Sequence, residues 1–375
     1  MNLGAFFIIF NPMKLKYLVL LFLAFSCSKT IEERCFIDEN ENHFDSYKEP
    51  KTYSVKDILE NKPDYLQVIS LKNFRSFKRD SLEAENLYNT LEKSGKYWKE
   101  QKALFADFEE KFFGQFLYSF KHTENNVKYA LGRNGLGYWL LEIKNDKPSA
   151  YFLGLSFSHY QFNKLQQNPI VKDGSFQLEG SFVKIIKVPG LPGYDDYSAI
   201  EDGKLFKIKL EDLKQDSDDD GYTDIFENCF GLNPNNKDTD GDGIKDFEDH
   251  NPLFKSEKNK FTALYECLVN QPLGGIRENL NKMDYFIMPF KSDCDYFQRI
   301  NLEAKVLIFP KDKEKQPYYV RVTDVFDGGY SKIKKDKNNP NVFYIFESGG
   351  GGTTDYRVEF KNGKWIVENV GGTIS

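Results

Sequence analysis

The sequence predicts an α+β fold with two globular regions, each with an antiparallel sheet, on either side of an acidic segment. Apolar residues recur with period two before and after residues 216–252, which indicates half-buried strands. Helical spacing precedes most of these strands in each region. The segment between them is rich in Asp and Gly and poor in apolar residues. We therefore divide the body of the chain into residues 52–214, 215–253 and 254–375.

The first region begins with a helix signal. Ser54 can cap a helix over residues 54–60, with Asp57 three residues later. Spacing rich in Glu and Lys predicts two helices within residues 80–113, separated at Ser94-Gly95. Period two then dominates, with a turn at residues 145–148. The predicted strands are residues 65–71, 127–131, 138–144, 150–158, 175–188 and 205–210.

The last region repeats this order on a smaller scale. A short helix is predicted over residues 262–270. Asn362-Gly363 lies between the last two strands and is a strong hairpin signal, because both residues tolerate positive φ. The predicted strands are residues 285–289, 304–309, 318–325, 342–346, 356–360 and 364–370.

The acidic segment contains one pattern of carboxylates twice. Each copy places acidic residues at positions 1, 3, 5, 9 and 12 of a twelve-residue loop and glycine at position 6. This is the spacing of an EF-hand-type calcium loop. The acidic residues are Asp216, Asp218, Asp220, Asp224 and Glu227 in the first copy, and Asp238, Asp240, Asp242, Asp246 and Asp249 in the second.

The chemistry of Ca²⁺ explains this spacing. Calcium takes six to eight oxygen ligands at about 2.3–2.6 Å, and carboxylates at alternate positions converge on one ion as the chain curls. Glycine at position 6 permits the sharp turn. Tyr222 and Ile244, at position 7, are expected to offer backbone carbonyls. Asp249 is one methylene shorter than Glu227, so we expect the second loop to close less tightly on its ion.

An acidic, solvated linker is the alternative interpretation, because runs of Asp and Gly are often disordered. The register of six repeated positions and the apolar residues between the ligands argue against it. The formal net charge of −6 supports a local cation site as well. Residues 216–249 hold twelve acidic and two basic side chains, so this segment carries −10 and the remainder +4. We see no dense basic patch, and therefore expect no nucleic-acid partner.

The sequences DGYTDIFENC, GLNPNN and DTDGDGIKDFED, in this order, resemble thrombospondin type 3 repeats in the form common in bacterial surface proteins. The resemblance implies a chain wrapped around two or more Ca²⁺ ions, with little apolar core of its own. On that basis residues 215–253 form a calcium-loaded junction that rigidifies the connection between two domains. Two features depart from the family: only two loops are present, and Glu248 stands where a cysteine is usual, which leaves Cys229 without its usual kind of partner.

The N-terminus has the pattern of a targeting segment. Residues 13–16 are charged, residues 17–25 are apolar but too short to span a bilayer, and Ser26-Cys27 follows. Residues 23–27 resemble a relaxed lipobox of Bacteroidetes-type lipoproteins, although Phe25 replaces a small residue. The resemblance implies a signal peptide over residues 1–27, lipid on Cys27, and a place at the outer membrane or cell surface. Secretion with a free Cys27 is the alternative, and translation can start at Met1 or Met13.

Residues 28–51 are polar and acidic, and we expect a flexible tether there. Four further cysteines can oxidise in an exported protein, and they allow three pairings. Cys267 with Cys294 is the preferred pairing because both lie in the last region, and free cysteines remain an alternative. These cysteines are Cys35, Cys229, Cys267 and Cys294.

No catalytic motif emerges from the sequence. The four histidines are scattered without HExxH or zinc spacing, and Ser156 lies in a predicted strand without the second glycine of a nucleophile elbow. The aromatic residues, 16% of the chain, fit strand cores better than sugar-binding platforms. The function predicted is therefore structural calcium binding at the cell surface, with an unidentified surface protein or glycan as partner. The alternative is a surface hydrolase or carbohydrate-binding protein that uses the repeats as a spacer.

Overall fold

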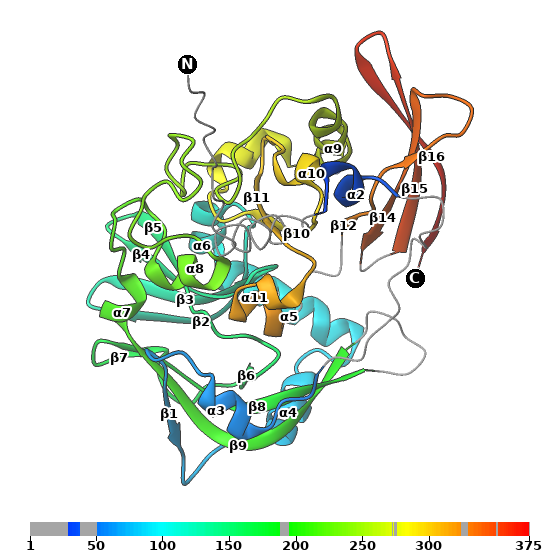
Figure 1. The fold of residues 1–375 in the computed structure, drawn as a ribbon. Coiled ribbons are helices and arrows are strands. Elements are labelled where there is room, and N and C mark those ends of the chain that lie inside the picture. Colours follow the sequence, from blue (N-terminus) through cyan, green and yellow to red (C-terminus); the bar gives the residue numbers. More distant parts are fainter. Residues whose placement is uncertain are drawn as a thin grey trace, which may run out of the picture.

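The computed structural model describes residues 29–37, 51–187, 195–271, 273, 276–323, 329–349 and 352–374. Helices and mainly antiparallel sheets make up these residues, as expected for an α+β fold (Figure 1). One strand pair, β10 (Ile287–Lys291) with β11 (Lys305–Phe309), is parallel. Residues 1–28, which include Cys27 and the predicted signal peptide, lie outside the described residues.

A four-stranded meander forms the first sheet. Its strands follow one another along the chain and pair antiparallel in the order β2-β3-β4-β5. The turn at Asn145-Asp146 has φ of 51° and 64°, the geometry of a two-residue hairpin whose twist matches that of its strands. The strands are β2 (Leu117–Glu124), β3 (Val127–Asn134), β4 (Gly137–Lys144) and β5 (Lys147–Phe152).

A second antiparallel sheet has the order β1-β9-β8-β6, with β7 paired to β8. Its long central strands β8 and β9 form the curved ribbon at the bottom of Figure 1, and α4 contacts β9. The capping box at Ser54 and Asp57 is present at the start of α3 (Val55–Glu60), as the sequence predicts. The strands are β1 (Gln67–Ser70), β6 (Tyr160–Phe162), β7 (Val171–Lys172), β8 (Ser175–Lys187) and β9 (Asp195–Lys209).

The stretch predicted as two helices, residues 80–113, contains parts of three: α4 (Phe77–Glu85), α5 (Leu91–Leu104) and α6 (Ala106–Phe112). The predicted break at Ser94-Gly95 is wrong, because Gly95 lies inside α5. A single exposed glycine costs a helix about 1 kcal/mol, which does not end it. Instead Thr90 caps α5, and its hydroxyl accepts the N–H of Lys93.

The last region contains short helices, the parallel pair β10–β11 and a separate antiparallel sheet. Residues 318–325 were predicted as a strand, but Tyr318–Thr323 forms the helix α11, which packs on α8 (Asp224–Phe230). Here tertiary packing overrides the β-propensity of Val and Tyr. The other helical elements are α7 (Leu210–Lys214), α9 (Lys260–Asn270), η2 (Arg277–Lys282), α10 (Asp295–Gln298) and η3 (Lys313–Lys315).

The C-terminal sheet has the order β12-β14-β15-β16, with β13 paired to β14, and it stands at the right of Figure 1. The predicted hairpin at Asn362-Gly363 is confirmed, with φ of 53° and 76°. The strands are β12 (Gly329–Tyr330), β13 (Lys334–Lys335), β14 (Val342–Gly349), β15 (Gly352–Lys361) and β16 (Lys364–Ile374).

Two hydrophobic cores exist, but they do not divide where the sequence predicts. Strand β11 is buried on both faces: Leu307 and Phe309 belong to the first core, while Val306 and Ile308 belong to the second. Residues of the acidic segment also enter the first core, and so does α11. The boundaries 214/215 and 253/254 therefore do not separate independent cores. The acidic segment contributes Tyr222, Ile225, Phe226, Phe230 and Leu232 to the first core.

The predicted tether over residues 28–51 is wrong in its described part. Residues Ile31–Cys35 form the helix α2, with a capping box at Thr30. Arg34 pairs with Asp295 at the start of α10 through two bonds of 2.7 and 2.9 Å, which hold α2 against the second core. Residues 38–50 lie outside the described residues.

The disulfide joins Cys35 to Cys294, so the preferred pairing of Cys267 with Cys294 is wrong. The Arg34–Asp295 ion pair and the bridge between Phe36 and Ile333 align α2 with the start of α10, which places Cys35 against Cys294. Cys267 is a half-buried free thiol. The sequence separation of 259 residues explains why proximity along the chain pointed to the wrong partner.

Peptide mapping without reduction tests this pairing. We expect a peptide that contains Cys35 linked to one that contains Cys294, with Cys267 open to alkylation after denaturation. We expect Cys35→Ser to lower the free energy of unfolding by about 2–5 kcal/mol, because the crosslink closes a long loop in the unfolded chain. A Cys267–Cys294 peptide would contradict the structure.

Candidate metal centre

Backbone N–H groups close the first acidic loop on its first carboxylate. The side chain of Asp216 accepts the N–H groups of Asp219 and Asp220, at 2.7 and 3.3 Å, and that of Gly221 at 3.0 Å. One oxygen of Asp220 then accepts the N–H of Tyr222 at 2.7 Å. These bonds curl the chain around the space toward which positions 1, 3 and 5 point.

The second loop repeats the first bond by bond. Asp238 accepts the N–H groups of Gly241, Asp242 and Gly243 at 2.7, 3.1 and 2.8 Å. Asp242 accepts the N–H of Ile244 at 2.8 Å. The duplicated spacing in the sequence therefore corresponds to a duplicated loop geometry.

A clamp between positions 2 and 9 was not predicted. Ser217 donates its N–H and its hydroxyl to Asp224, both at 2.7 Å. Thr239 donates the same groups to Asp246, at 2.8 and 2.6 Å. A hydroxyl residue at position 2 of both copies was the sequence signal for this clamp.

Three groups of carboxylates could hold a metal ion, and within each group the ligand atoms lie within 4.8 Å of one another. Two groups are positions 1, 3 and 5 of the loops, as predicted. The third connects the loops, because position 9 of the second meets positions 5 and 12 of the first. The groups are Asp216, Asp218 and Asp220; Asp238, Asp240 and Asp242; and Asp220, Glu227 and Asp246.

Several of these oxygens are buried without a hydrogen-bond partner among the described residues. They include both oxygens of Glu227 and of Asp218, and one each of Asp220 and Asp240. Glu227 is completely buried, with a relative exposure of 0%. A buried charge without a partner costs several kcal/mol, and removal from water is offset only by paired charge or a metal. The donor set therefore fits a cation bound by oxygen.

The electrostatics of the loops point the same way. Burial, followed by repulsion from Asp218 and Asp220, raises the pKa of Glu227 to about 9. Burial likewise raises the pKa of Asp220 and of Asp240 to about 6. Without a cation Glu227 therefore resists ionisation at neutral pH, whereas the ionisation of Asp220 and Asp240 is only shifted toward neutral pH. A divalent ion reverses this effect, because it is the largest local charge in such a site.

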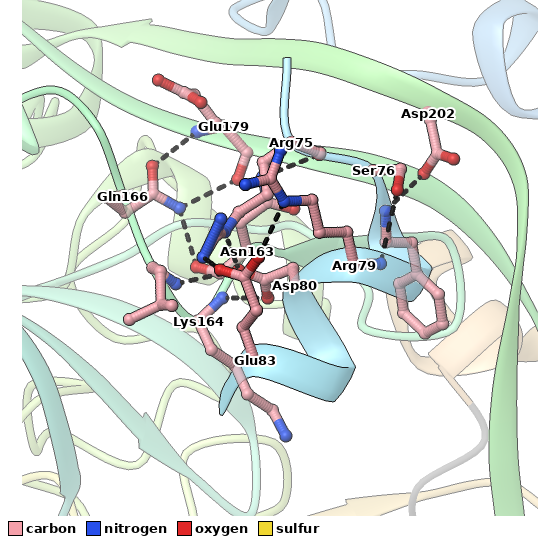
Figure 2. A network of polar contacts seen from close by, with 12 residues as sticks. Arg75, Ser76, Arg79, Asp80, Glu83, Asn163, Lys164, Gln166, Glu179 and Asp202 are labelled. Atoms are coloured by element: carbon pink, nitrogen blue, oxygen red, sulfur yellow. Dashed lines mark hydrogen bonds and ion pairs between the residues drawn. The ribbon is translucent and has the colours of Figure 1, made fainter. Parts of the chain in front are cut away.

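The polar network around Asp80 provides a contrast (Figure 2). Asp80 is also buried, but it accepts the guanidinium of Arg75 at 3.1 Å and the N–H groups of Lys164 and Leu165 at 2.6 and 3.1 Å. Glu83 beside it pairs with Arg75. This network fastens α4 to the neighbouring loop and satisfies Asp80 from within the chain. Both oxygens of Glu227 and of Asp218 lack such donors among the described residues, so they need a partner from outside the chain.

Two of the predicted carboxylate ligands lie outside the three groups. Asp224 accepts Ser217 and the side-chain amide of Gln215, so it acts through the clamp. Asp249 is buried, and one of its oxygens accepts the N–H of Asn251 at 2.9 Å.

The two position-7 residues differ in their surroundings. Ile244 is exposed. The ring of Tyr222 is buried and stacks on Phe226 at 4.2 Å between centroids. The contacts of the described residues do not test whether the backbone carbonyls of Tyr222 and Ile244 bind calcium, so this role stays a prediction.

Neither a family model, nor a curated protein, nor a solved structure matches this chain. The resemblance to thrombospondin type 3 repeats thus depends on the loop residues alone.

A buried lysine, not predicted as part of the site, closes one side of it. Lys305, at the start of β11, donates to the backbone carbonyls of Phe247 and Asp284 and lies 4.1 Å from the centre of the Phe247 ring. Burial lowers the pKa of Lys305 to about 8, although Asp284 and Asp220 oppose the shift. Lys305 therefore connects the end of the second loop to the strand that both cores share.

Glu227→Gln provides a test whose sign depends on the cation. With a chelator we expect the variant to unfold at a higher temperature than the wild type, because an amide avoids the cost of burying or protonating the Glu227 carboxyl, whose pKa burial raises to about 9. With added calcium we expect the order to reverse, and the affinity for calcium to fall at least about tenfold, or about 1.4 kcal/mol.

Asp219→Asn is the matched control for this test, since Asp219 lies in the same loop with a fully exposed side chain. Thermal denaturation with chelator and with calcium measures both variants. If Glu227→Gln and Asp219→Asn behave alike in both conditions, no cation occupies the buried group.

Proposed function

We propose that the two loops bind structural calcium ions and that these ions complete the first hydrophobic core. The observation that carries this proposal is the group of Asp220, Glu227 and Asp246, which is buried, draws on both loops and has unpartnered oxygens. A bound cation there balances the repulsion and fastens one loop to the other.

The donor set favours calcium over other divalent ions. All three groups consist of carboxylates, without histidine or cysteine, and zinc and copper prefer nitrogen and sulfur ligands. Magnesium keeps several waters and demands near-octahedral geometry, whereas calcium accepts six to eight oxygens in flexible arrangements. Extracellular calcium modules bind in the range of about 10⁻⁴–10⁻³ M, which suits constant occupancy rather than signalling.

The ions have a larger role in this proposal than that of a rigid spacer. Glu227 lies on α8 between Phe226 and Asn228, and Phe226 and Phe230 of the same helix reach the first core. Fixing Glu227 therefore fixes the helix that carries these rings. The junction that calcium rigidifies is the interior of the first core and its contact with β11.

We further propose that lipid on Cys27 anchors the protein at the outer membrane or cell surface. No helix of the described residues is long and apolar enough to cross a membrane. Thr30 caps α2 and is three residues after Cys27, which corresponds to at most about 11 Å of extended chain. The disulfide at Cys35 would then hold the second core close to the lipid. At the surface, an unidentified surface protein or glycan would be the partner.

Calorimetric titration of chelator-treated protein tests calcium binding. We expect two or more sites. Asp216→Ala with Asp220→Ala should remove more than one site, because Asp220 belongs to two of the three groups. Asp238→Ala with Asp242→Ala should remove one site and serves as the matched comparison. No heat of binding at roughly millimolar calcium would favour the acidic-linker interpretation instead.

Metabolic labelling with a radioactive fatty acid tests the anchor. We expect label in the wild-type protein and none in Cys27→Ser, because lipid attachment needs the thiol. Cys267→Ser is the control and should keep the label. Equal label in wild type and Cys27→Ser would exclude this anchor.

A further inference from the structure

A cavity of about 410 Å³ lies beside the first loop, in the first core. Its walls come from the segment after α3, the turn after β5, α7, α8 and α11, and α8 and α11 are neighbours in Figure 1. This volume lies in the range of about 300–1,000 Å³ that is typical of small-molecule sites. Gly154 brings the backbone close here, because a Cβ at this residue would lie 2.1 Å from the hydroxyl of Tyr65.

The lining of this cavity excludes anionic ligands. It contains no lysine or arginine, while Asp64, Asp212 and Asp224 contribute carboxylates. His159 is buried, and its burial lowers its pKa to about 4, so the ring is neutral at pH 7. A phosphate or carboxylate ligand would find no positive charge, because no cationic side chain lies in the wall.

The same lining does not form a hydrolytic site. Ser156 and His159 both line the cavity, but the ring nitrogens of His159 have no hydrogen-bond partner among the described residues. The hydroxyl oxygen of Ser156 instead accepts the N–H of Ser158 at 3.2 Å, so Ser156 and His159 do not form the hydrogen-bonded pair of a nucleophile and its base. Burial raises the pKa of the Cys229 thiol, so this thiol is not the reactive thiolate. The cavity is suited to binding rather than to bond cleavage.

Tyrosine rings and side-chain amides remain as the recognition groups. Tyr160, Tyr318 and Tyr319 contribute aromatic rings to the lining, and Asn228 contributes its amide. Gln215 contributes its amide oxygen, because its amide nitrogen already donates to Ser217 and Asp224. Aromatic faces pack on the apolar faces of a sugar ring, and amides and a neutral imidazole can both donate to and accept from its hydroxyls. An organic cation is favoured less, because Asp64 is exposed at the edge of the lining and both oxygens of Asp224 already accept hydrogen bonds from Ser217. Choline is therefore the cationic comparison in the test below.

We propose that this cavity binds a neutral pyranose sugar, the terminal unit of a glycan, and that the first loop positions one of its walls. The second part rests on the proposed calcium binding. Asp224 is position 9 of the loop and the first residue of α8, and Asn228 is one turn further along that helix. Asn228 donates its amide N–H to the carbonyl of Asp224 at 2.7 Å, which ties the cavity wall to the loop.

Calorimetric titration of the full chain in calcium tests the first part, with D-glucose, D-galactose and N-acetyl-D-glucosamine as probes and choline as the cationic comparison. We expect saturable binding of at least one sugar, weakened at least about tenfold by Asn228→Ala and by Tyr318→Ala. Asn338→Ala, on the exposed surface of the second region, is the matched control and should bind like the wild type. Binding of choline alone, binding of none of the sugars, or undiminished binding by both cavity variants would overturn the proposal.

Repeating the sugar titration with chelator tests the second part. We expect weaker sugar binding, and by reciprocity tighter calcium binding when sugar is present. Equal sugar affinity with and without calcium, in protein that does bind calcium, would overturn the link between loop and cavity. If the protein binds no calcium at all, the proposed function is refuted instead. Sugar binding by the cavity is then decided by the sugar titration alone.

Discussion

The burial of Glu227 among other carboxylates is the constraint on which the rest of the structure depends. Glu227 shares α8 with Phe226 and Phe230, whose rings lie 5.7 Å from Trp139 and 6.2 Å from Phe309 between centroids. The helix cannot deliver these rings to the core without also burying the carboxylate. Aromatic burial favours this position of α8, and the cost of burying or protonating the Glu227 carboxyl opposes it. A cation bound to Glu227 would offset the cost of burying its carboxyl. We therefore propose that calcium is part of the first core and not of a spacer between two domains.

Strand β11 extends this dependence to the second core. Alternate side chains of the strand face the two cores, and its first residue, Lys305, contacts the end of the second loop. The Cys35–Cys294 disulfide secures the far side of the second core and shares no residue with the loops. The two cores are therefore held by different means: the first by its aromatic rings and the loop segment, the second by its own packing and a covalent bond.

Local signals in the sequence predicted the local structure well. The capping box at Ser54, the hairpin at Asn362-Gly363 and the two loops each depend on residues close in sequence, and each is present. Contacts between distant residues escaped prediction. The partner of Cys294 is 259 residues away, and Asp246 meets the first loop only because the second folds back on it. Period two also misassigned α11, whose packing on α8 no local pattern encodes.

Amide hydrogen exchange with and without calcium tests the central claim most directly, since it reports on each element separately. If calcium completes the first core, chelation will reduce amide protection in α8, β5, α11 and β11. It will leave the amides of β14–β16 largely protected. Loss of protection confined to residues 216–252, with β5 and α11 unchanged, would contradict the account. It would favour the interpretation in which these residues are only a spacer between two domains.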